Sequence, residues 1–288
     1  MRPHTLRRVT TLTLTLAVAA CAPQSDDIQD KASEDTIAPH DMLVTARDFT
    51  FAEAPDTVPA GPTNVRLLNE GTDFHHVVLI RLEQGKTIDE LLQHLGTAHG
   101  KMPSWAVELG GPNSPRPGGG ESAAVVDLTP GNYAMLCVVP ATDGQLHLQK
   151  GMVRPLVVVP NNTGRTPQVP TADVVMTLAD YTFTTSAPIA AGRRTIRLEN
   201  VAEQAHEVIL AKLEPGKTAQ DLLSFIEKRQ GPPPGMPLGG VTGIGKGQVN
   251  YITADFQPGE YVLICLYPDI NDNLPHAAHG MVKQFTVS

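Results

Sequence analysis

Pro130-Gly-Asn-Tyr-Ala-Met-Leu-Cys137 and Pro258-Gly-Glu-Tyr-Val-Leu-Ile-Cys265 are two copies of one segment within the same 288-residue chain. Each copy begins with a Pro-Gly turn and continues as a short, mostly apolar run, which is the pattern of a buried β-strand. His206 follows His75 by 131 positions and Cys265 follows Cys137 by 128, so the period is that of a duplicated domain and not of a solenoid. Other segments repeat in the same order: 44–51 with 175–183, 64–70 with 195–200, and 74–82 with 205–213.

The repeated segments predict an all-β fold with one inserted helix in each copy. They are short, rich in β-branched residues and separated by Gly, Pro or Asn, as strands joined by turns are. Thr87 with Glu90, and Thr218 with Asp221, have the spacing of a capping box and predict the two helices. The Gly/Pro-rich passages 110–120 and 231–247 are predicted to be irregular lids or loops.

The first twenty residues have the features of a secretion signal. Arginines precede an apolar run from Val9 to Ala20, which is too short to span a membrane. The run ends in Val-Ala-Ala-Cys21, which resembles a bacterial lipobox, so residues 1–20 are expected to be a lipoprotein signal peptide and Cys21 to be lipidated. The alternative is a soluble secreted protein with an ordinary cleavage site near Cys21.

This N-terminus places the mature chain at the cell envelope, lipid-anchored and facing the periplasm or the exterior. Contact with the membrane is expected only through the lipid, since no later segment has about 18 consecutive apolar residues. Residues 21–40 are acidic and polar and are predicted to be a disordered tether. Residues 41–159 and 172–288 are the predicted domains, joined by a linker over 160–171 that is rich in Asn, Thr and Pro.

The charge balance argues against a nucleic-acid partner. The chain has 22 Lys and Arg residues against 30 Asp and Glu residues. Removing residues 1–20 removes three arginines and no acidic residue, which leaves 19 against 30 and a net charge of −11 with neutral histidines. Phosphate binding needs clustered Lys and Arg, which this composition does not provide.

Each repeat contains the same potential metal ligands in the same order. In both repeats four residues separate the later histidine from the methionine, and a glycine precedes the methionine. A thiolate, two imidazoles and a thioether are the donors of a mononuclear blue-copper site, in which the methionine is a weak axial ligand. We therefore expect one copper ion per domain, held in the first by His75, Cys137, His147 and Met152, and in the second by His206, Cys265, His276 and Met281.

These motifs resemble the cupredoxin family, of which plastocyanin and azurin are members. His75-His-Val-Val-Leu and His206-Glu-Val-Ile-Leu resemble the strand of the first histidine ligand, and Pro-Gly-x-Tyr-x-x-x-Cys is similar to the strand that leads to the copper cysteine. The resemblance implies two tandem cupredoxin-like antiparallel Greek-key sandwiches with an electron-transfer site in each. Alignment of the copies selects His75 over His76, because neighbours on a strand point to opposite faces.

The sequence departs from the family pattern between the cysteine and the second histidine. Nine residues (138–146) intervene in the first repeat and ten (266–275) in the second, where the family usually has only a few. Such a loop could return the imidazole to the metal or hold it away. The type of site depends on this point more than the fold does.

Three functions are compatible with these observations. The first is a copper-binding protein for electron transfer or copper handling, whose partner is a redox or copper-donor or copper-acceptor protein. An enzyme such as a two-domain copper oxidase or nitrite reductase would need a second, histidine-rich copper centre, but no His-x-His occurs and Leu136 and Ile264 precede the cysteines. The chain is therefore expected not to be an enzyme. The third is a metal-free binding or structural module at the cell envelope, because a lone buried Cys or a loop Met is usually a packing residue.

The remaining candidates are weaker. Four histidines, His76, His94, His99 and His279, have no counterpart in the other repeat and are expected at the surface, with His279 as a fallback ligand. Trp105 is expected to pack under the lid. A Cys137–Cys265 disulfide is not expected, because it would require the Cα atoms of two separate cores to lie within about 7 Å.

Overall fold

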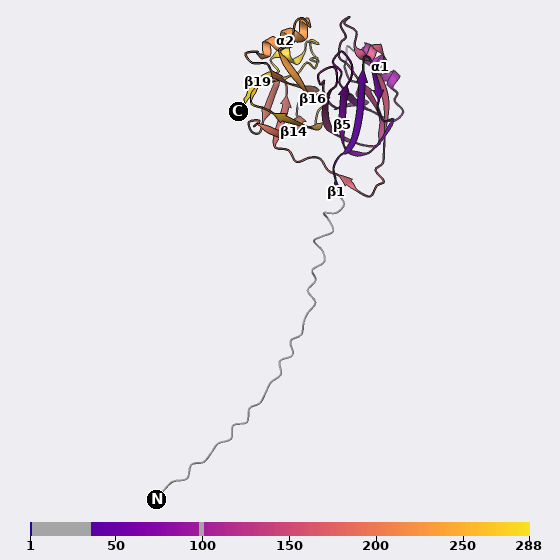
Figure 1. The fold of residues 1–288 in the computed structure, drawn as a ribbon. Coiled ribbons are helices and arrows are strands. Elements are labelled where there is room, and N and C mark those ends of the chain that lie inside the picture. The colour runs from indigo at the N-terminus through magenta and orange to yellow at the C-terminus, as the bar shows by residue number, and fades with distance from the viewer. Residues whose placement is uncertain (2–35, 98–100) are drawn as a thin grey trace. The chain divides into compact units, whose positions relative to one another are not determined.

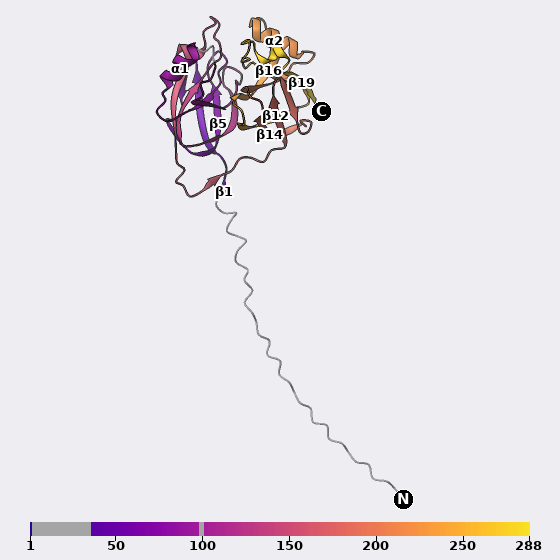
Figure 2. The same ribbon diagram turned by 180° about the vertical axis from the view of Figure 1, so that it is seen from behind.

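The computed structural model describes residues 36–97 and 101–288, together with Met1. The predicted signal peptide, Cys21, most of the tether and His99 lie outside the described residues. The regular structure of the described chain is mostly β-strand, with two α-helices that lie at one end, opposite β1 (Figures 1 and 2). None of the described helices is long and apolar enough to cross a membrane.

The two repeats have matching element orders. The first repeat consists of β1 (Thr36–Ile37), β2 (His40–Arg47), β3 (Thr50–Glu53), β4 (Thr57–Pro59), β5 (Gly61–Asn69), β6 (Val78–Leu82), α1 (Ile88–Thr97), β7 (Ala106–Gly110), β8 (Gly120–Leu128), β9 (Gly131–Leu136) and β10 (Val153–Val159). After β11 (Thr166–Pro167), the second repeat consists of β12 (Val174–Ala179), β13 (Thr182–Thr185), β14 (Gly192–Asn200), β15 (His206–Leu213), α2 (Ala219–Lys228), β16 (Gly235–Ile244), β17 (Val249–Phe256), β18 (Gly259–Ile264) and β19 (Val282–Val287). The all-β fold with one helix inserted in each repeat is confirmed.

Two large sheets run through both repeats. Their strand orders are β19-β18-β15-β16-β7-β6-β9-β10-β4 and β13-β12-β14-β17-β8-β5-β2-β3. The repeats join where β16 pairs with β7 through Ile244 and Leu109, and where β17 pairs with β8. Each repeat nevertheless has its own large apolar core between the two layers. The division into domains at 41–159 and 172–288 stays a prediction.

The sandwiches are mainly antiparallel, as predicted, but each also contains parallel strand pairs. β2 pairs with β5, β12 with β14, and β10 with β4 in parallel. The reason is the path of the chain in the first repeat. Between β2 and β5 it crosses to the other sheet as β4, so that β5 returns beside β2 in the same direction.

The Pro-Gly-x-Tyr motif of each repeat forms a tyrosine corner. The hydroxyl of Tyr133 donates to the carbonyl oxygen of Thr129 (2.7 Å), and that of Tyr261 donates to the carbonyl oxygen of Gln257 (2.8 Å). Both rings are buried in the core. This bond from a core side chain to the preceding turn holds the start of β9 and β18, and so aligns the strands that end at the cysteines.

Some loop predictions were wrong. Residues 235–244, within the predicted loop 231–247, form β16, whose Gly240 allows the backbone to approach β15 so closely that a Cβ would collide with the carbonyl oxygen of Val208. Trp105 packs against α1 and not under a lid. The predicted tether and linker also contain ordered pairing, because β1 pairs with β11, and β2 already begins at His40.

Both predicted helix starts are confirmed by their capping bonds. The Glu90 N–H donates to Thr87 Oγ1 and the Thr87 N–H donates to Glu90 Oε2. Thr218 and Asp221 make the same reciprocal pair at the start of α2. Two orphan donors are thus satisfied at each helix start.

Candidate metal centres

In each repeat the structure brings two histidines and the cysteine together. The donor atoms of His75, Cys137 and His147 lie within 4.8 Å of one another, as do those of His206, Cys265 and His276. The six side chains are buried with 0% exposure. The long loops between cysteine and histidine therefore do not carry the second histidine into solvent.

Backbone hydrogen bonds explain how the first long loop returns. The Leu148 N–H donates to the carbonyl oxygen of Cys137 (2.8 Å) and the His147 N–H donates to that of Val139 (2.9 Å). Residues 140 and 146 form an isolated β-bridge, so the residues between them form a short closed loop. His147 therefore lies beside Cys137 in space although nine residues separate them.

In the second repeat, equivalent backbone hydrogen bonds return the loop to the cysteine. The Ala277 N–H donates to the carbonyl oxygen of Cys265 (2.8 Å) and the His276 N–H donates to that of Tyr267 (2.9 Å). A bridge between residues 268 and 275 closes the ten-residue excursion. Two loops of different length thus present the histidine in equivalent positions.

Met152 and Met281 follow the later histidines by one turn of 3-10 helix. In both repeats the methionine N–H donates to the histidine carbonyl oxygen at 3.0 Å, and the cysteine N–H donates to the methionine carbonyl oxygen at 3.2 and 3.1 Å. Gly151 and Gly280, with φ of 105° and 96°, allow this turn because glycine tolerates the left-handed region. Both methionines are buried beside the cysteines in the cores.

Each first histidine is oriented by an aspartate. His75 Nε2 lies 2.8 Å from Asp48 Oδ1, and His206 Nε2 lies 3.1 Å from Asp180 Oδ1. Thr72 also donates to Asp48 through its N–H and its hydroxyl. Burial alone would raise the pKa of Asp48, but the hydrogen bonds from Thr72 and His75 hold it well below its ordinary value. The charged carboxylate therefore accepts the Nε2 proton and leaves Nδ1 free to bind a metal.

The second histidines also direct Nε2 toward oxygen atoms. His147 Nε2 lies 3.4 Å from Asp73 Oδ2, and His276 Nε2 lies 3.4 Å from Gln204 Oε1. Burial lowers the pKa of His147 below the ordinary imidazole value and lowers that of His276 to about 4. Both rings are therefore neutral near pH 7, with one proton each.

An aromatic ring covers each second histidine edge-on. The ring centroids of Phe49 and His147 are 4.8 Å apart, and those of Tyr181 and His276 are 5.5 Å apart. The Tyr181 hydroxyl donates to Asp269 Oδ2 (2.5 Å), which anchors this ring over the second centre. The covering rings exclude water from the imidazoles.

The facing nitrogen atoms fit a metal ion. Nδ1 of His75 lies 3.1 Å from Nδ1 of His147, and the corresponding distance between His206 and His276 is 2.9 Å. With the protons on Nε2, two lone pairs would oppose each other unless a cation lies between them. Moving one proton to Nδ1 would instead leave an Nε2 lone pair facing a carboxylate or amide oxygen. His147 Nε2 is in fact buried without a hydrogen-bond partner of acceptable geometry.

The cysteine sulfur completes each donor set. Cys137 Sγ lies 3.4 Å from His147 Nδ1, and Cys265 Sγ lies 3.5 Å from His276 Nδ1. Burial raises the pKa of Cys137 to about 12 and raises that of Cys265 further. Such thiols are inert unless a metal ion deprotonates them. Two nitrogens, one sulfur and a buried Met thus fit a type-1 copper site in each repeat.

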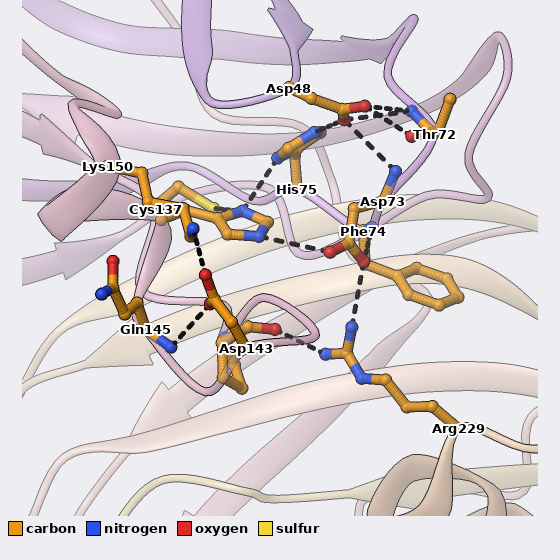
Figure 3. A network of polar contacts seen from close by, with 12 residues as sticks. Asp48, Thr72, Asp73, Phe74, His75, Cys137, Asp143, Gln145, Lys150 and Arg229 are labelled. Atoms are coloured by element: carbon orange, nitrogen blue, oxygen red, sulfur yellow. Dashed lines mark hydrogen bonds and ion pairs between the residues drawn. The ribbon is translucent and has the colours of Figure 1, made fainter.

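A residue of the second repeat reaches the surroundings of the first centre. Arg229, which follows α2, donates to Asp73 Oδ1 (3.0 Å) and to the carbonyl oxygen of Pro140 (2.8 Å). Figure 3 shows this contact beside the Asp48, Thr72 and His75 group. Arg229 thus holds both the carboxylate behind His147 and the loop between Cys137 and His147.

The structure buries His76 and leaves His279 outside the second centre. His76 is buried with 6% exposure and accepts the Val138 N–H at Nε2 (3.0 Å), so the expectation of a surface residue was wrong. It follows His75 and supports the segment that contains the cysteine. His279 is partly exposed beside Asp272 and is not part of the His206 group.

Sequence reasoning missed Asp48 and Asp180. They occupy matching positions in Asp48-Phe-Thr-Phe and Asp180-Tyr-Thr-Phe, and this repetition was the available signal. It was not decisive, because a charged residue between two strands is also typical of an ordinary exposed turn.

Comparisons with known proteins give weak likenesses. No protein-family model and no curated protein matches the chain. Among solved structures, a dithionite-reduced auracyanin from Roseiflexus castenholzii is 20% identical over 43% of this chain and 99% of that one, with a TM-score of 0.33. Auracyanin A from Chloroflexus aurantiacus is 18% identical over 41% and 99%, with a TM-score of 0.28. A copper nitrite reductase from Nitrosomonas europaea is 13% identical over 88% and 94%, with a TM-score of 0.25.

These scores are too low to decide anything about this chain, so the assignment depends on its own geometry. Both repeats are two-layer sandwiches, and each carries a buried His–Cys–His group in which the cysteine directly follows one strand and the first histidine lies at or shortly before the start of its neighbour. The chain has a cupredoxin-like fold. The cupredoxin-like repeats also have one inserted helix each, as the sequence predicted.

Proposed function

We propose that this protein is an extracytoplasmic copper protein that carries electrons, with one copper ion in each cupredoxin-like repeat. The histidines and the cysteine are the proposed ligands of each centre, with Met152 and Met281 as weak axial ligands. A copper ion held there would supply a one-electron couple. The chain's own residues orient the imidazoles, exclude water and hold the thiolate.

One observation carries this proposal. In both repeats two imidazoles direct Nδ1 at each other and at a cysteine sulfur, while their Nε2 atoms face oxygen atoms. A donor set held from behind in this way is preorganised for a metal ion. A metal-free packing module would gain nothing from opposed lone pairs.

Complete burial favours electron transfer over copper delivery. The proposed nitrogen and sulfur ligands belong to side chains with 0% exposure. A delivery protein needs a path by which its partner can reach the metal ligands, whereas an electron can leave through covering side chains. The expectation that the chain is not an enzyme stays a prediction.

The test is metal analysis of the protein isolated from its own envelope, with absorption and EPR spectra of the copper-loaded form. We expect intense visible absorption from a copper–thiolate bond and slow loss of copper to a chelator. Rapid, complete transfer of copper to the chelator would favour copper handling. Absence of copper and of visible absorption would leave the metal-free module.

The lipid anchor is a separate part of the proposal. Val-Ala-Ala-Cys21 closes the apolar region and is its only support. We expect Cys21→Ser to release the protein from the membrane fraction. If this variant stays in the membrane after a salt wash, the anchor lies elsewhere.

A further inference from the structure

The residue after the first histidine has the same task in both repeats, although its chemical identity differs. His76 Nε2 accepts the N–H of Val138, which follows Cys137, at 3.0 Å. Glu207 Oε1 accepts the N–H of Leu266, which follows Cys265, also at 3.0 Å. Each side chain therefore ties the segment of the first histidine to the segment of the cysteine in its own centre.

Asn113 lies between these two side chains. It belongs to the segment between β7 and β8 and is 2% exposed. Its Nδ2 donates to Glu207 Oε2 (3.2 Å), and its side chain also lies against the imidazole of His76. Because His76 Nε2 accepts an N–H, the neutral imidazole carries its proton on Nδ1, which is therefore a donor.

Asn113 is fixed in this position from other directions. Its N–H donates to the carbonyl oxygen of Gly240 (3.2 Å), and Ser122 Oγ donates to its carbonyl oxygen (2.6 Å). Its Nδ2 also lies 3.2 Å from the carbonyl oxygen of Val241. A side chain held by both repeats cannot shift for one partner without affecting the other.

The result is a continuous buried chain of polar contacts between the two centres. It runs from the Val138 N–H through His76, Asn113 and Glu207 to the Leu266 N–H. Glu207 also approaches the second centre directly, because its own N–H lies 3.4 Å from Cys265 Sγ. The chain thus begins beside one proposed ligand cysteine and ends beside the other.

We propose that His76, Asn113 and Glu207 couple the two metal centres, so that a metal ion in one centre increases the affinity of the other. This inference rests on the proposed copper binding. Metal in the first centre would fix Cys137 and His75, and with them the Val138 N–H, His76 and Asn113. The second centre then binds its metal with less ordering still to be done, which is positive cooperativity.

The experiment compares copper(I) affinities measured anaerobically by competition with a chelator. The Cys265→Ser chain gives the constant of the first centre alone, and the Cys137→Ser chain gives that of the second centre alone. The native chain gives the two stepwise constants. We expect the product of the two stepwise association constants of the native chain to be at least about fivefold larger than the product of the two single-site association constants. The ratio of these products is the coupling factor.

Substitutions in the His76–Asn113–Glu207 bridge test whether it couples the two centres. Asn113→Ala, introduced into all three chains, is expected to reduce this factor to one. Asn250→Ala is the matched control, because Asn250 is equally buried and donates across the repeats to the carbonyl oxygen of Leu109 (2.8 Å) without touching the bridge. It should leave the factor unchanged. If Asn113→Ala does not fold, Glu207→Gln tests the same bond, because the amide keeps an acceptor for Leu266 and opposes Asn113 with a donor.

A second readout does not depend on affinities. In the Cys265→Ser chain, copper(I) in the first centre should shift the NMR signal of the Leu266 amide, and Asn113→Ala should abolish that shift. If the native chain takes up no copper, the proposed function fails. If it takes up two ions with a coupling factor of one, or if Asn250→Ala abolishes the coupling equally, the bridge does not couple the centres.

Discussion

Glu108 is a buried carboxyl group whose removal should stabilise the protein in a pH-dependent way. It lies on β7 with 8% exposure, and its Oε2 accepts the hydroxyl of Tyr267 (2.7 Å) from the second repeat. Burial raises its pKa from 4.5 to about 7. The Tyr267 hydrogen bond opposes this rise, and the charge of Glu207 adds to it.

The number of protons bound by the folded and unfolded states decides how the free energy of unfolding changes with pH. In the unfolded chain this carboxyl group titrates at its ordinary pKa of 4.5, so between that pH and about 7 the folded state binds more protons than the unfolded state. The free energy of unfolding therefore falls as the pH rises through this range. A difference from 4.5 to about 7 corresponds to about 3 kcal/mol, present below the lower value and lost above the upper one. That is a large part of a typical total stability of about 5–15 kcal/mol.

Urea denaturation of the metal-free chain at pH 4.5 and pH 8 measures this contribution. Glu108→Gln keeps an oxygen acceptor for Tyr267 and carries no charge. We expect the variant to be about 3 kcal/mol more stable than the native chain at pH 8 and nearly equal to it at pH 4.5. Glu214→Gln, on the exposed surface, is the control and should change neither value. A difference between Glu108→Gln and the native chain that is the same at both pH values would refute the reasoning.

Three further substitutions test the surroundings of the centres. In Gly71→Ala the new Cβ would collide with Asp48 Oδ1 and His75 Nε2. The copper affinity of the first centre should therefore fall by about 10–100-fold. An unchanged affinity would show that Asp48 does not orient His75. Arg229→Ala removes a cation from beside Asp73 and should lower the reduction potential of the first centre while leaving the second unchanged, as redox titration would show; equal shifts in both centres would contradict this. Met281→Leu should raise the potential of the second centre without loss of copper, because the axial thioether tunes the site more than it holds the metal; loss of copper on dialysis would contradict that role.

The fold was predictable because its determinants are local and occur twice. The Pro-Gly-x-Tyr segments, the alternating strands and the capped helices at Thr87 and Thr218 each have a sequence signature, and the duplication made each signature more reliable. The parallel pairs and the strand at 235–244 were not predictable. Parallel pairing depends on where the chain crosses between the sheets. The strand β16 forms because its glycines allow it to lie close to its partner, β15.

The candidate metal ligands were predictable by type and order, but the residues that support them were not. The order of His, Cys, His and Met survives in the sequence whatever the loop length. The return of the imidazole depends on backbone hydrogen bonds to Cys137 and Cys265, which no spacing rule expresses. Asp48 and Asn113 come from segments distant in the sequence, so only the folded structure shows which residues they contact.

The most direct test of the central claim is a copper titration followed by EPR and visible absorption in three chains. The native protein should take up two copper ions per chain and show two type-1 signals. Cys137→Ser should abolish one signal and Cys265→Ser the other, and each variant should still bind one ion. Uptake of no copper by the native chain, or spectra that neither cysteine substitution changes, would contradict the account.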